Sequence, residues 1–340
     1  MSDKNKFTVV RLNSLTFPPN DDERNILATA NAKMLEIEGA NDEEISSSAK
    51  DADAIMIVSS YLRNPVIRQL KKCRIISRMG TGVDKIDVEQ ATRQGIIVTN
   101  LPDFCTDEVG DHTVALLLSV ARQLKESDIQ MRKGKKHGDI VNTHRLSVQS
   151  VGLVGFGRIG RAVAKRCRSF GMKVLSFDPA LTTEMAEKED VTTVPLDRLL
   201  KESDYVCLLC PLLPSTRKMI SMKQLVKMKK SAVLVNTGRG ELVNEADLVK
   251  ALKEGIIRFA ALDVFAGINV FAPDGFPTDH PFFSLDNVLL TPHVAALSQE
   301  SLSDSRLRGA QAVADVLGGQ WPRHPVNPEV QPWFSIGNQE

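Results

Sequence analysis

Short apolar, β-branched runs alternate with segments of helical periodicity almost from the start of the chain. The runs at residues 8–11, 34–37, 54–58, 74–77 and 96–99 predict strands. Residues 22–32, 64–72 and 87–94, which lie between these runs, predict helices. Strands separated by helices and short turns are typical of a parallel sheet covered on both faces. The first third of the chain is therefore predicted to form an α/β unit.

A longer helical pattern at residues 106–132 separates this series from a second one. It opens with Thr106, Asp107 and Glu108, which suit a helix N-terminus. Strands are then predicted at residues 150–154, 173–177, 205–209, 232–236, 257–262 and 288–290, and a final helix at 298–317. The pattern predicts two α/β units, and it leaves open whether the final helix belongs to the second unit or returns to the first.

Composition excludes several classes of protein. The 340 residues favour two domains, and 42% hydrophobic with 25% charged residues exclude a wholly disordered chain. The 43 basic and 42 acidic residues give no general field that would attract nucleic acid or a membrane. Residues 1–6 lead into no apolar signal segment, and no apolar run is long enough to span a bilayer. We therefore expect a cytoplasmic protein without nucleic-acid or membrane partners.

The cysteines predict neither disulfides nor a metal site. Five scattered cysteines do not form a disulfide framework. Cys207 and Cys210 match a Cys-x-x-Cys pattern, but they fall within a predicted strand and no second pair completes a zinc site. We expect these two thiols to be buried, and no metal is expected.

The strongest local motif is Gly155-Phe-Gly157-Arg158-Ile159-Gly160, which follows an apolar strand and opens a helix. In that context the first glycine allows a tight turn, the second lets a pyrophosphate approach the backbone, and the third allows close helix–strand packing. The next predicted strand ends at Asp178, whose carboxylate would accept hydrogen bonds from ribose hydroxyls and repel a 2′-phosphate. The motif predicts NAD as the cofactor.

Further segments, in their order along the chain, resemble the D-isomer-specific 2-hydroxyacid dehydrogenase family. They are Arg78-Met-Gly80-Thr81-Gly82-Val-Asp-Lys-Ile-Asp87, the glycine motif with Asp178, Asn236-Thr237-Gly238-Arg239-Gly, Ala261-Leu-Asp263-Val-Phe, and Leu290-Thr-Pro-His293. The segment from Pro292 to Ser301 is most similar to the subgroup that contains the C-terminal-binding protein corepressors and their bacterial enzyme relatives.

The resemblance implies a flavodoxin-like substrate domain (residues 1–104 and 299–340) and a Rossmann NAD-binding domain (105–298), with a cleft between them. It implies a homodimer in which the segment around residues 106–122 supplies much of the contact. Arg239 would bind the substrate carboxylate and polarise the keto oxygen, and His293 would be the acid–base catalyst. The resemblance also implies substrate contacts at Ser59, Gly80, Thr81, Gly82 and Arg239. The implied cofactor contacts are Gly155, Gly157, Arg158, Ile159, Gly160, Asp178, Thr216, Thr237, Gly238 and Asp263.

Two departures from the family pattern bear on function. The glutamate that usually follows the Asp-Val-Phe segment, before a proline, is missing, and the loop at 266–284 is longer than usual. Asn269, Asp274 and Asp279 are the candidates to replace it. Ser59 and Ser60 also stand where phosphoglycerate-oxidising relatives often have an arginine, which disfavours a phosphorylated substrate although Arg63 is near in sequence.

The leading hypothesis is an NAD-dependent oxidoreductase that interconverts a small 2-keto acid and its D-2-hydroxy acid. The alternative is an NAD(H)-responsive dimeric binding protein with weak or no dehydrogenase activity, which the missing glutamate favours. A reductase for an inorganic oxyanion is a minor third reading.

Overall fold

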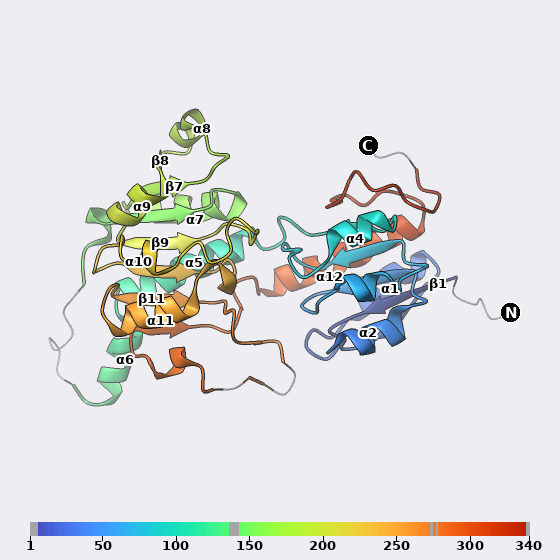
Figure 1. The fold of residues 1–340 in the computed structure, drawn as a ribbon, viewed down its shortest axis with the longest axis horizontal. Coiled ribbons are helices and arrows are strands. Elements are labelled where there is room, and N and C mark those ends of the chain that lie inside the picture. The colour runs from blue at the N-terminus through green and yellow to red at the C-terminus, as the bar shows by residue number, and fades with distance from the viewer. Residues whose placement is uncertain (1–5, 136–142, 273–274, 277, 338–340) are drawn as a thin grey trace. The chain divides into compact units, whose positions relative to one another are not determined.

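The computed structural model of the protein describes residues 6–135, 143–272, 275–276 and 278–337. The chain divides into two compact units (Figure 1). Unit 1 takes its described residues from 1–104, 271–274 and 298–340, and unit 2 from 105–270 and 275–297. The final helix, whose place the pattern left open, is part of unit 1.

Unit 1 is built on a five-stranded parallel sheet. Its strands are β1 (Phe7–Arg11), β2 (Ala32–Glu36), β3 (Ala54–Ile57), β4 (Ile75–Arg78) and β5 (Ile97–Thr99). They lie in the order β2-β1-β3-β4-β5, which is the flavodoxin-like order. One face packs against α2 (Asp42–Ala49), α3 (Asn64–Ile67) and α4 (Val88–Arg93), and the other against α1 (Asp21–Thr29) and α12 (Gln299–Leu317).

Unit 2 is built on a seven-stranded parallel sheet. Its strands are β6 (Ser150–Val154), β7 (Lys173–Phe177), β8 (Thr192–Thr193), β9 (Tyr205–Leu208), β10 (Val233–Asn236), β11 (Phe259–Leu262) and β12 (Val288–Leu290). The order β12-β11-β10-β9-β6-β7-β8 reverses between β6 and β9, as in a Rossmann fold. The predicted α/β class with two doubly wound parallel sheets is confirmed.

Helices cover both faces of the unit 2 sheet. One core lies between the sheet and α5 (Thr106–Ala121), α7 (Arg158–Ser169) and α8 (Thr183–Lys188). The opposite core involves α9 (Leu196–Glu202), α10 (Met222–Leu225) and α11 (Glu245–Lys253). The strands read as nearly continuous apolar runs because both of their faces are buried.

The single long helix predicted at residues 106–132 is wrong. The chain forms α5 and then α6 (Leu124–Arg132), because Gln123 adopts a left-handed conformation (φ 51°) that interrupts the helix. The helix predicted at 64–72 is also shorter than expected, because α3 ends at Ile67. After it, the amides of Gln69 and Leu70 each donate to the carbonyl three residues earlier, so the chain continues as turns.

No described helix combines the length and apolar character needed to cross a bilayer. Of the two cysteines in the Cys-x-x-Cys pattern, Cys207 is fully buried in β9, and burial raises the pKa of its thiol well above the usual range. Cys210 was predicted to lie inside this strand, but β9 ends at Leu208, so Cys210 is only partly buried; burial still raises its pKa to about 11. Neither thiol is primed to react.

Candidate active site

The predicted cofactor and catalytic residues of unit 2 follow the carboxyl ends of its strands. Because all seven strands are parallel, these ends lie along one edge of the sheet, which is where open α/β sheets bind ligands. The residues that follow these ends are Gly155 after β6, Asp178 after β7, Thr237 to Arg239 after β10, Asp263 after β11, and Thr291 to His293 after β12.

The three motif glycines each have a different structural reason. Gly155 has φ +103°, and a Cβ there would lie 2.7 Å from the backbone nitrogen of Cys210. A Cβ on Gly160 would lie 2.5 Å from the Gly155 carbonyl oxygen, so this position allows the first turn of α7 to approach the loop. A Cβ on Gly157 would meet nothing within 4 Å. A side chain at residue 157 would therefore enter open space at the N-terminus of α7, the end of a helix that favours anions.

Asp178 is joined to the glycine loop. One carboxylate oxygen accepts a hydrogen bond from the Phe156 amide (2.7 Å), and the other accepts one from the Ala180 amide (2.8 Å). The side chain is half-buried. Its negative charge is thus fixed beside the loop, in the position from which an acidic residue selects NAD over NADP.

The other predicted cofactor residues lie on or near the same loops. Arg158 is exposed and Ile159 half-buried in the first turn of α7. The Thr216 hydroxyl donates to the Pro211 carbonyl (2.7 Å) and accepts from the Leu213 amide (2.8 Å), so it stabilises the loop after β9.

The Arg239 loop is stabilised by the buried side chain of Asn236. The Asn236 amide donates to the Arg239 carbonyl (2.8 Å), and its oxygen accepts from the Gly238 amide (3.1 Å). The guanidinium of Arg239 is half-buried and donates to the Gly238 carbonyl (2.8 Å). Gly240 packs directly on the next loop, because a Cβ there would overlap the backbone of Phe265. These contacts restrict the backbone of the loop that carries Arg239.

His293 lies in a turn that Asp263 organises. His293 has a left-handed backbone (φ 57°), and its amide donates to the Asp263 carbonyl (2.9 Å). The fully buried Asp263 carboxylate accepts from the amides of Val294 and Ala295, each at 3.0 Å, and from the Thr291 hydroxyl at 2.6 Å. Burial raises the pKa of Asp263, but the hydrogen bonds outweigh it and hold that pKa below its ordinary value. Asp263 is therefore a buried anion whose hydrogen bonds fix the histidine turn.

The structure does not identify a replacement for the missing glutamate. Asn269 and Asp279 are exposed, and Asp274 lies outside the described residues. Ile268 is buried, while Glu245 accepts hydrogen bonds from the Ala266 and Gly267 amides (2.7 and 3.1 Å) at the base of the loop.

The predicted substrate residues of unit 1 follow β3 and β4. Ser59 donates its amide to the Asn13 side-chain oxygen (2.8 Å), which also accepts from the Val58 and Ser60 amides. The Gly80 amide donates to the Arg78 carbonyl (2.8 Å), so it is engaged within its own loop. In the same loop, the Thr81 hydroxyl donates to the Leu101 carbonyl (3.1 Å), and the Gly82 carbonyl accepts from Arg78 Nε (2.8 Å).

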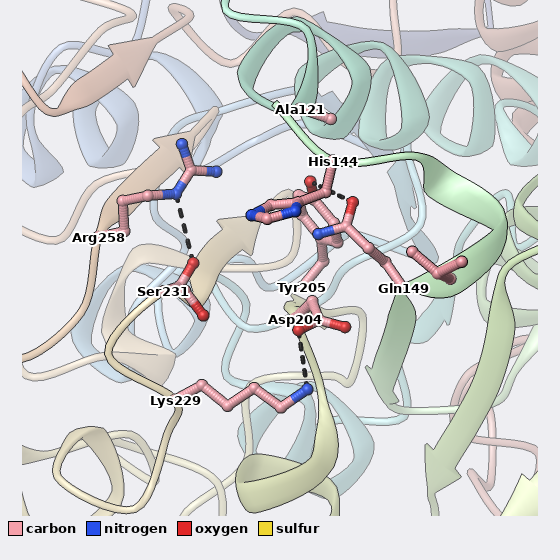
Figure 2. A pocket seen from close by; sticks show the side chains of 9 residues that line it. Ala121, His144, Gln149, Asp204, Tyr205, Lys229, Ser231 and Arg258 are labelled. Carbon is pink, nitrogen blue, oxygen red and sulfur yellow. Dashed lines mark hydrogen bonds and ion pairs between the residues drawn. The ribbon is translucent and has the colours of Figure 1, made fainter. Parts of the chain in front are cut away.

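A polar cavity of about 320 Å³ lies at the opposite edge of the unit 2 sheet. Figure 2 shows Lys229 paired with Asp204 and Arg258 bonded to the Ser231 carbonyl beside it. Tyr205 begins β9, and Ser231 and Arg258 come just before β10 and β11, so the cavity is at the amino ends of the strands. None of the predicted site residues lines it.

Two polar side chains of α5 that were not predicted from the sequence, His112 and Thr113, contact the loops that carry the predicted catalytic residues. His112 Nε2 lies 3.1 Å from the Thr291 hydroxyl, and the Thr113 hydroxyl lies 2.7 Å from that of Thr237. The sequence gives one indication of their role: both are polar residues in an apolar helical stretch, at positions that the helical period would bury.

Comparison with known proteins gives one consistent result. The NAD binding domain of the D-isomer specific 2-hydroxyacid dehydrogenases matches residues 114–295. Glyoxylate reductase of Korarchaeum cryptofilum is 39% identical over 84% of this chain and 86% of its own length. D-3-phosphoglycerate dehydrogenase of Methanocaldococcus jannaschii is 37% identical over 88% of this chain, which spans only 56% of that protein.

Among solved structures, D-lactate dehydrogenase of Aquifex aeolicus in complex with NAD and lactic acid superposes with a TM-score of 0.81. It is 27% identical, and the match covers 92% of this chain and 96% of that one. The sequence matches and the two parallel sheets agree with one another, and the chain belongs to the D-isomer specific 2-hydroxyacid dehydrogenase family.

Proposed function

We propose that this protein is an NAD-dependent oxidoreductase that reduces a small 2-keto acid to its D-2-hydroxy acid and catalyses the reverse oxidation. The observation that carries the proposal is that the glycine loop, Arg239 and His293 follow strands of one parallel sheet at the same edge. NADH supplies the hydride when it is bound. The three glycines and Asp178 provide an open, anion-compatible turn and a fixed carboxylate that fit this cofactor.

Arg239 and His293 have complementary roles in this proposal. The guanidinium of Arg239 is always charged and donates two parallel hydrogen bonds, so it binds the substrate carboxylate and polarises the keto oxygen. The imidazole of His293 gives its proton to the oxygen that becomes the hydroxyl, and it takes the proton back in the oxidation. Asp263 stabilises the turn that carries His293.

The substrate proposed is small and not phosphorylated. Three consecutive amides, those of Val58, Ser59 and Ser60, could otherwise cradle a phosphate, but they already donate to Asn13. The relative from Korarchaeum cryptofilum is named a glyoxylate reductase, which supports glyoxylate as the first substrate to test.

The test is turnover with NADH and a panel of glyoxylate, pyruvate, hydroxypyruvate, 3-phosphohydroxypyruvate and bulkier 2-keto acids. We expect turnover of at least one unphosphorylated acid, measured by loss of NADH absorbance. For an acid whose product has a stereocentre, such as pyruvate, chiral chromatography should show the R-configured (D) product, whereas the glycolate formed from glyoxylate is achiral. Arg239→Met is the matched control, because it should bind NADH normally and lose turnover. No turnover of any acid by a protein that binds NADH would refute the proposal.

A second candidate function is an NAD(H)-responsive dimer like the C-terminal-binding proteins. It is favoured by the absence of the family glutamate and by α6, which exposes Leu124, Ile129 and Met131. The reductase and dehydrogenase names of the relatives reported above favour the enzyme. A dimer–monomer equilibrium unchanged by NADH in analytical ultracentrifugation would exclude the second candidate.

We also propose a cytoplasmic homodimer. The apolar side chains of α5, including Val114 and Leu117, are largely buried inside unit 2, so contact through residues 106–122 would be extended by the exposed side chains of α6. Met131→Glu together with Ile129→Glu should then give a monomer.

A further inference from the structure

Two consecutive residues of α5 contact both catalytic loops. His112 Nε2 lies 3.1 Å from Thr291 Oγ1, and Thr113 Oγ1 lies 2.7 Å from Thr237 Oγ1. Thr291 stands two residues before His293, and Thr237 stands two residues before Arg239. One turn of one helix is thus bonded to equivalent positions of the two loops that carry the proposed catalytic side chains.

The hydroxyl protons give each contact a direction. The Thr291 hydroxyl donates to Asp263 Oδ1 (2.6 Å), so its oxygen accepts the proton on His112 Nε2. This nitrogen also lies 3.5 Å from Asp263 Oδ1. The result is a chain of hydrogen bonds from His112 through Thr291 to the buried Asp263 carboxylate, which fixes the turn on both sides of His293.

The direction of the contact between Thr113 and Thr237 follows in the same way. The Thr113 hydroxyl donates to the Val109 carbonyl within α5 (2.7 Å), so it accepts the hydroxyl proton of Thr237. Thr113 is fully buried and Thr237 nearly so. A buried hydroxyl left without its partner is costly, so the loop after β10 is held against the helix.

The histidine turn needs such support. A left-handed backbone at a residue other than glycine is strained and persists only where its surroundings hold it. His293 has this conformation, with φ 57°. An error of about 1 Å in the position of a catalytic group can cost a hundredfold in rate.

We infer that His112 and Thr113 are positioning residues, through which α5 sets the spacing between the acid–base turn of His293 and the carboxylate-binding loop of Arg239. This inference rests on the proposed function. His112 acts through Thr291 and Asp263, and Thr113 acts through Thr237.

The two contacts are tested with paired variants. His112→Leu removes the donor, whereas His112→Gln places an N–H at a similar reach. Thr113→Val removes the hydroxyl at nearly constant shape, whereas Thr113→Ser keeps it. We expect His112→Leu to lower kcat about 10- to 100-fold with KM changed less than about threefold, because the acid–base turn shifts. Thr113→Val should chiefly raise KM, because Arg239, the proposed carboxylate anchor, shifts. His112→Gln should restore kcat, and Thr113→Ser should restore KM.

Apo Tm and the NADH Kd of each variant are measured alongside. Equal losses of kcat, NADH affinity and Tm in Leu and Val variants would indicate a structural role only and overturn the inference. Wild-type kinetics in His112→Leu would overturn it as well.

A second readout does not depend on turnover. The ring resonances of His293, assigned with a His293→Gln variant, should move in His112→Leu and stay in place in His112→Gln. If the wild type reduces no 2-keto acid, the proposed function fails, while an unchanged His293 resonance in His112→Leu separately overturns the positioning role.

Discussion

Replacing Gly157 and Gly160 separately by alanine should separate cofactor binding from folding. A Cβ at 157 meets no protein atom within 4 Å, whereas a Cβ at 160 lies 2.5 Å from the Gly155 carbonyl oxygen. In Gly157→Ala, the gain of about 0.4–1 kcal/mol from a stiffer unfolded chain is offset by a poorer helix N-cap, which costs a similar amount. At roughly 2–4 °C per kcal/mol, the apo Tm should stay within about 2 °C of wild type.

NADH affinity should respond differently from stability. The new methyl group in Gly157→Ala occupies the space proposed for the pyrophosphate and interrupts hydrogen bonds to a charged group, worth about 1.5–3 kcal/mol. That loss corresponds to a Kd raised about 10- to 150-fold. Gly160→Ala overpacks the start of α7, so it should cost about 1–3 kcal/mol and lower the apo Tm by about 2–12 °C.

The assays are thermal unfolding of the apo protein by circular dichroism and titration of NADH fluorescence. Wild-type NADH affinity in Gly157→Ala would refute the placement of the pyrophosphate at this turn. Wild-type stability in Gly160→Ala would refute the close approach of α7 to the loop.

Three other variants test the charged groups of unit 2. Arg239→Lys keeps the charge and loses the planar fork, so kcat/KM for the keto acid should fall about 100-fold while the NADH Kd changes less than threefold; equal kinetics would argue against bidentate binding. Asp178→Ser removes the carboxylate beside the glycine loop, and the ratio of NADPH to NADH affinity should rise at least tenfold, as measured by parallel titrations. The pKa of Asp263 is lowered in the folded state, so this group stabilises the protein fully above about pH 4 and less as the pH falls through the lower folded value. Asp263→Asn should therefore flatten the decrease of Tm below pH 4. The same decrease of Tm in wild type and variant would contradict a stabilising role for the Asp263 carboxylate.

Local patterns were sufficient to predict most of the strands of both sheets, because a strand buried on both faces must be apolar along its length. β6 and β7 begin and end where the pattern placed them. Two weakly apolar elements were not predicted. The helix α2 contains three consecutive serines, and the strand β8 (Thr192–Thr193) is too short to show a period. The break at Gln123 has no local signal, since its flanking residues continue a helical period.

In the site, too, only the residues that belong to a local sequence pattern could be predicted. The glycines and Asp178 could be identified because their spacing along the chain is itself the motif. His112 could not, because its partners Thr291 and Asp263 are more than 150 residues away in the sequence and meet it only when the sheet forms. The order of residues also shows that the family glutamate is missing, but it does not show what the longer loop places there.

The return of α12 to unit 1 has a consequence for synthesis of the chain. Ala310, Val313 and Val316 of this helix cover Val9, Met56 and Ile75 in the unit 1 sheet, and Ser77 donates to the Gly309 carbonyl. The strands of that sheet leave the ribosome about 200 residues earlier, which at about 5–20 residues per second is an interval of roughly 10–40 s. During that time the part of this apolar face that α12 covers is exposed, while α1 covers the rest, so the nascent N-terminal segment should be a chaperone client until residue 317 emerges. A premature stop anywhere within unit 2 should yield an insoluble product rather than a shorter folded one.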